Sequence, residues 1–181
     1  MKSRQDDAVH AIDAADEENH IIEEESVQLL SFLQGRDIYG LPIRTVREVI
    51  DTINITTIPL VPDYIRGVIN LRGKVIPVID LQARFGYGQS DVKKTSSIII
   101  NEIPVEDDIV EIGLMIDQVK EVMMFPKNSI DETPDFGTTI RNDFISGIGR
   151  YADNYIVILH TERLLNIDEL SRFTAAGTTH D

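Results

Sequence analysis

Two stretches of the chain repeat each other without a gap. Residues 40–49 (GLPIRTVREV) return 73 positions later as residues 113–122 (GLMIDQVKEV), with six of the ten positions identical. Two shorter matches follow at an offset of 80, residues 65–68 with 145–148 and residues 76–79 with 156–159. A solenoid needs at least three repeats to bury its faces, so two copies do not make one. The repeat therefore predicts one structural unit built twice, as two similar modules that share a core.

Composition limits the classes of partner and chemistry. A length of 181 residues with 42% hydrophobic residues suggests one domain or two small packed modules. The net charge of −14 argues against nucleic acid and against insertion at an anionic membrane surface. The absence of cysteine excludes disulfides, thiolate nucleophiles and cysteine-bound metals. We expect partners that are basic or mixed in charge.

The N-terminal segment is acidic and lacks the apolar core of a signal peptide. Residues 1–26 hold nine carboxylates and two basic residues, so we expect a disordered leader that is inert or selects partners. No window of about 18 apolar residues predicts a membrane helix. These features predict a cytoplasmic protein.

Short apolar runs separated by turn residues follow the leader. Strands are expected at residues 27–33, 38–43, 51–57, 66–69, 74–81, 97–103, 110–116, 119–125, 145–148 and 155–160. Val46, Val49 and Ile50 stand at helical spacing in a short β-branched segment, so helix and strand both remain open there. The pattern predicts a mainly all-β fold, as a barrel or a sandwich.

The expected domain divides into two modules and a C-terminal helix. Residues 27–90 would form the first module and residues 95–160 the second, within one domain of residues 27–173. Asn166 and Glu169 resemble a capping box that starts a short helix over 166–173. Residues 174–181 are small and polar and should fray.

Motifs for catalysis or cofactor binding fail on detail. The four histidines show no metal-ligand spacing. Residues 67–74 resemble a phosphate-binding loop, but five residues separate the glycines where the motif has four, and Val75 stands where Ser or Thr would hold magnesium. Residues 147–152 fit a dinucleotide fingerprint, but a turn and a strand follow them instead of a helix. We therefore expect no catalytic residues, no cofactor and no metal, rather than an enzyme with a cryptic acid/base site or a nucleic-acid-binding barrel.

One charged pair stands out in the first repeat. Arg72 lies among apolar residues and would need an anionic partner if it were buried. Glu48, whose own neighbours are apolar, is the candidate. The alternative is that both side chains extend to water.

Residues 27–170 resemble the CheW family of bacterial chemotaxis coupling proteins. The resemblance is densest in residues 65–81 (IRGVINLRGKVIPVIDL) and continues in residues 113–122. It implies two five-stranded, SH3-like β-barrels with a hydrophobic seam between them. It also implies a non-enzymatic adaptor, recruited to receptor arrays at the inner face of the membrane. The adaptor would couple the cytoplasmic hairpin tip of transmembrane chemoreceptors to the regulatory domain of a CheA-type histidine kinase. An alternative is the same role in a non-flagellar array, for surface motility or another output.

The resemblance also implies roles for single residues. Glu48 and Arg72 match the family's structural or coupling ion pair. The positions linked to receptor contact are Val46, Gly67, Gly113, Val119 and Val122, which would otherwise be turn glycines and barrel core. Kinase contact is expected at Asn70, Leu71 and Lys74.

Overall fold

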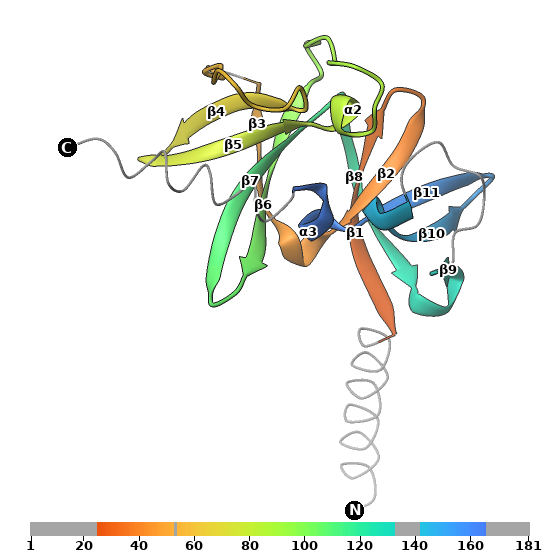
Figure 1. The fold of residues 1–181 in the computed structure, drawn as a ribbon. Helices are drawn as coiled ribbons and strands as arrows, with labels where there is room; N and C mark the ends of the chain where they lie inside the picture. The colour runs from red at the N-terminus through yellow and green to blue at the C-terminus, as the bar shows by residue number, and fades with distance from the viewer. Residues whose placement is uncertain (1–24, 53, 133–141, 166–181) are drawn as a thin grey trace, which may run out of the picture.

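The computed structural model describes residues 25–52, 54–132 and 142–165, which form two β-sheets with a few short helical turns (Figure 1). The predicted mainly β class with two β subdomains is confirmed. Figure 1 shows the five-stranded sheet on the left and the six-stranded sheet, to which β1 belongs, on the right.

The first half of the chain supplies five strands. These are β1 (Ser26–Gln34), β2 (Asp37–Pro42), β3 (Val46–Asp51), β4 (Ile65–Leu71) and β5 (Lys74–Asp80). The 3₁₀ turn η1 (Ile43–Thr45) precedes β3, and the one-turn helix α2 (Leu81–Arg84) follows β5. The segment left open between helix and strand is therefore strand β3. Its residues alternate between half-buried and exposed positions, as a β-strand with one face on a core requires.

The second half repeats this order. Its strands are β6 (Ser97–Val105), β7 (Asp108–Ile116), β8 (Gln118–Pro126), β9 (Ile130–Asp131), β10 (Ile145–Tyr151) and β11 (Asn154–Leu159). Three short turns complete it: η2 (Lys127–Ser129), η3 (Asn142–Phe144) and α3 (Thr161–Leu164). The expected C-terminal helix, the tail and all but the last two leader residues lie outside the described residues. Among those described, no helix is long and apolar enough to cross a membrane.

The two halves exchange their first hairpins. The sheet orders are β8-β1-β2-β11-β10-β9 and β3-β6-β7-β5-β4. Hairpin β1–β2 thus joins strands of the second half through parallel pairing of β2 with β11, and β6–β7 joins the first half through parallel pairing of β5 with β7. The expected division into residues 27–90 and 95–160 does not match this pairing. The reason is that both hairpins present similar apolar strands, so chain order does not determine which sheet each completes.

Three apolar clusters fill the molecule. One lies in the five-stranded sheet around Val78 and Ile100, and one lies in the six-stranded sheet around Leu29 and Ile158. The largest draws buried residues from both sheets and is the seam between them. β6 serves two clusters, because Ile98 and Ile100 face the inside of their own sheet while Ile99 faces the seam. The predicted hydrophobic seam is therefore present.

In each sheet, the segment that follows one edge strand pairs with a strand at the opposite side and so closes the sheet. Beyond β3, Thr56 forms a bridge to Val68 of β4, and beyond β8, strand β9 pairs with β10. Both closures depend on a glycine of the repeat. A Cβ on Gly67 would lie 2.1 Å from the Thr56 carbonyl oxygen, and one on Gly147 would lie 2.7 Å from a methyl group of Ile130.

Substitution of Gly67 should open the five-stranded sheet. Its φ of +147° is one that L-residues rarely adopt, and the added methyl group would meet backbone, not a flexible side chain. We expect Gly67→Ala to lower the free energy of unfolding by about 2–4 kcal/mol, measured by urea denaturation. Gly88→Ala is the matched control, because Gly88 also has a positive φ but no atom lies within 4 Å of the added Cβ. Equal losses in both variants would contradict the steric explanation.

Candidate functional site

The hairpin between β4 and β5 ends in a tight turn. Arg72 and Gly73 have φ values of 50° and 81°, as a two-residue hairpin loop with both central residues left-handed requires. The Asn70 side-chain oxygen accepts a hydrogen bond from the Gly73 amide at 3.1 Å. The turn holds the Arg72 side chain over the end of the five-stranded sheet, beside β3.

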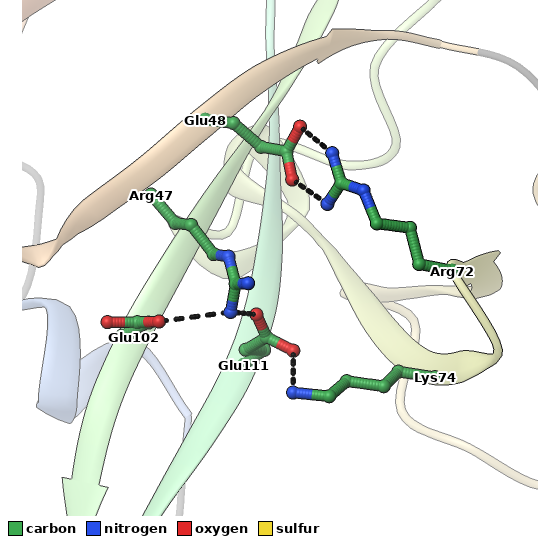
Figure 2. Close-up of polar contacts among 6 residues, drawn as sticks. All are labelled: Arg47, Glu48, Arg72, Lys74, Glu102 and Glu111. Carbon is green, nitrogen blue, oxygen red and sulfur yellow. Dashed lines mark hydrogen bonds and ion pairs between the residues drawn. The ribbon is translucent and has the colours of Figure 1, made fainter.

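Arg72 and Glu48 form the ion pair that the sequence predicts. The Arg72 guanidinium donates two hydrogen bonds to the Glu48 carboxylate, at 2.6 and 2.9 Å (Figure 2). The Arg72 side chain is 64% exposed and that of Glu48 is 24% exposed, so the open question of burial is settled in favour of a pair at the surface. The hydrogen bond from Arg72 lowers the pKa of Glu48 from its ordinary value. The bidentate geometry fixes the direction of both groups more than it stabilises the fold.

A second set of ion pairs adjoins this one. Arg47 contacts Glu102 at 3.1 Å and also pairs with Glu111, and Lys74 pairs with Glu111 at 3.1 Å (Figure 2). The backbone joins the two sets of ion pairs at both ends. Arg47 is adjacent to Glu48 in the chain, and Lys74 lies two residues from Arg72. We call these six residues the ionic ring: Arg47, Glu48, Arg72, Lys74, Glu102 and Glu111.

Sequence reasoning missed three members of the ionic ring. Glu102 and Glu111 lie directly opposite each other in the β6–β7 hairpin, where like charges are destabilising unless a cation offsets them. Arg47 supplies that cation. The register of the predicted hairpin could have revealed the two carboxylates, but no local pattern points to Arg47.

The predicted receptor positions divide into two groups. Val46 of β3 and Val119 of β8 both pack against the seam cluster and are half-buried. Val122 is 55% exposed, and its repeat equivalent Val49 is 42% exposed. These four valines stand at matching places on β3 and β8, one half-buried against the seam cluster and one exposed on each strand.

The two glycines predicted for receptor contact lie inside the five-stranded sheet. Gly67 and Gly113 are buried and flank Val78 in adjacent strands. A Cβ on Gly113 would lie 2.7 Å from a methyl group of Ile98. Internal packing accounts for glycine at both positions.

The predicted kinase positions meet at the β4–β5 turn. Asn70 and Lys74 are exposed, while Leu71 is half-buried against the cluster inside the five-stranded sheet. Lys74 also belongs to the ionic ring. Among residues 25–52, 54–132 and 142–165, no group of three or more His, Cys, Asp or Glu side chains could hold a metal ion.

The ion pair should make stability depend on pH in the acid range. Because the folded-state pKa of Glu48 is lowered, the pair's stabilisation is present above the ordinary value of 4.5 and is lost as the pH falls through the lower folded-state pKa. Glu48→Gln should lower the melting temperature slightly and equally from about pH 7 to about pH 5, and by less at lower pH. Glu121→Gln, at the repeat-equivalent position, should have no effect, because Glu121 is in no ion pair within the described residues. A difference that stayed constant to about pH 3 would contradict this assignment.

Comparison with known proteins shows the family of the chain. The model of the CheW-like domain matches residues 28–169. A chemotaxis protein CheW from Helicobacter pylori is 32% identical over 146 residues, covering 80% of this chain and 85% of that protein. One from Treponema pallidum is 26% identical over 151 residues, covering 83% and 89%. The crystal structure of the scaffolding protein TtCheW from Thermoanaerobacter tengcongensis superimposes with a TM-score of 0.71 at 40% identity, over 79% of this chain and 90% of that one. The chain therefore belongs to the CheW family.

Proposed function

We propose that the protein is a non-enzymatic adaptor of a chemotaxis array. One face binds the hairpin tip of a chemoreceptor and another binds the regulatory domain of a CheA-type histidine kinase, which recruits the protein to the inner face of the membrane. Family membership supports this role, as do the relatives described above, which are chemotaxis and scaffolding proteins. These relatives favour chemotaxis over surface motility.

The single observation that supports the receptor part is the placing of the four valines at matching positions on β3 and β8, around the seam cluster. Val46 and Val119 contact one core cluster shared by both sheets, with the exposed Val49 and Val122 on the same two strands. An amphipathic helical hairpin can bury its apolar face on such side chains. Gly67 and Gly113 act instead by allowing the strands to pack closely.

The kinase face is assigned to the β4–β5 turn. Asn70 and Lys74 present an amide and a cation beside the half-buried Leu71, on a turn that a hydrogen bond and two ion pairs hold in place. A rigid turn loses little conformational entropy when a partner binds. The β4–β5 turn is therefore suited to recognise a folded domain.

Kinase binding can be measured directly. Calorimetric titration with the regulatory domain of the kinase from the same cell should give saturable one-to-one binding. Absence of binding between two folded proteins would overturn the kinase part of the proposal.

Receptor binding should depend on Val122. Its exposure means that Val122→Asp should fold normally, while a charge at this position should weaken binding of the isolated receptor hairpin roughly tenfold or more. Ile109→Asp is the matched control, because Ile109 is 69% exposed and lies at the tip of the β6–β7 hairpin, outside both faces. Equal affinity of the two variants for the hairpin, measured by fluorescence anisotropy, would contradict the location of the receptor face.

A further inference from the structure

Glu111 is the centre of the ionic ring. Its side chain is only 9% exposed, and its two oxygens bind cations from different strands, Arg47 on β3 and Lys74 on β5. Figure 2 shows its carboxylate between the two cationic side chains. In the sheet order β3-β6-β7-β5-β4, this one carboxylate on β7 links strands on both of its sides.

The ionic ring joins two places where the backbone departs from regular structure. Arg47 lies at a β-bulge, since the register of β3 against β6 shifts between Val46 and Glu48. Arg72 and Lys74 belong to the left-handed turn of the β4–β5 hairpin. The bulge carries Val46 of the proposed receptor face, and the turn carries the proposed kinase face. Glu111 and the Arg72–Glu48 pair thus connect the bulge to the turn through ion pairs.

The backbone fold forms without such ion pairs in the other sheet, which repeats the backbone but, among the described residues, pairs none of the equivalent positions. Ala152 occupies the place of Arg72 in the β10–β11 turn and has nearly the same φ, 51° against 50°. Ile38 stands where the first sheet has Glu111, and it packs into the cluster inside its own sheet. Lys120 and Glu121 keep the charges of Arg47 and Glu48, but within the described residues they are in no ion pair. Among the described residues, one copy of the unit therefore closes without ion pairs at the positions where the other copy has the ionic ring.

The contacts can exchange without burying an unpaired charge. Arg47 is 41% exposed and Lys74 is 66% exposed, so either can leave Glu111 for water. Glu111 then keeps the other cation. A salt-bridge network that can take up more than one discrete arrangement is one of the structural routes by which coupling between two sites is carried.

We propose that Glu111 is a positioning residue that couples the receptor face to the kinase face. The proposal rests on the proposed adaptor function and adds how occupancy of one face changes affinity at the other. Coupling between two sites is reciprocal, and typical values are about 5- to 150-fold in affinity.

The structural link between the β3 bulge and the β4–β5 turn can be tested in the protein alone, without its partners. Glu111→Gln removes the charge and keeps the shape, and Asp107→Asn is the matched control, with the same change of charge at an exposed position in the turn of the same hairpin. Hydrogen exchange should become faster in Glu111→Gln at both the Val46–Val49 bulge and the β4–β5 turn, including the Gly73 amide. Asp107→Asn should match the wild type at both places. Faster exchange at only one place, or at neither, would overturn the link.

The functional part is a linkage experiment on the full chain. The Kd for the kinase regulatory domain is measured with and without saturating receptor hairpin, and the reverse titration checks reciprocity. We expect the wild type and Asp107→Asn to show the same coupling factor. In Glu111→Gln we expect each partner alone to bind within about threefold of the wild type, and the coupling factor to fall to about one.

The outcomes separate the two proposals. Coupling that persists in Glu111→Gln, or a wild type that binds both partners without coupling, overturns the role of Glu111 and leaves the adaptor function standing. A folded wild type that binds neither partner overturns both. Loss of binding to each partner alone in a folded Glu111→Gln would make Glu111 part of a contact face and would also overturn the coupling role.

Discussion

The parallel pairing of β2 with β11 and of β5 with β7 holds the two halves of the molecule together. Each half contributes a hairpin that completes the sheet of the other, so neither half can close a sheet from its own strands. The two repeats are consequently one cooperative unit, although the sequence divides readily into two. The seam follows from this exchange, because the exchanged hairpins have one face in a sheet interior and the other face on the shared cluster.

Each sheet closes at a position where only glycine fits. Gly67 and Gly147 stand at equivalent points where the chain after an edge strand returns to the opposite edge. A side chain there would displace the returning segment, and with it the bulged edge strand. Glycine at both positions thus permits the close approach of the returning segment.

The two sheets have nearly the same backbone but carry different side chains. Both sheets carry a bulge in their edge strand and a hairpin turn with a left-handed residue, yet only one builds the ionic ring. Because the backbone is nearly duplicated, the difference lies in side chains, and side-chain chemistry at a site, not the fold, is what carries function. The arrangement of charges therefore distinguishes the two subdomains more than their topology does.

The sequence by itself determined the repeat, the mainly β class and the family, because these depend on patterns within the chain. It named Glu48 as a candidate partner for Arg72, and the family resemblance, not a local pattern, implied the pair, since the two residues are 24 positions apart. Only the tertiary structure decided which sheet receives each hairpin, because strands of the same apolar pattern can complete either one. It also decided that the Glu48–Arg72 pair is exposed and that Glu111 joins Arg47 to Lys74. Those side chains come from β3, β5 and β7, and their distances depend on the order of strands across the sheet, which no local pattern encodes.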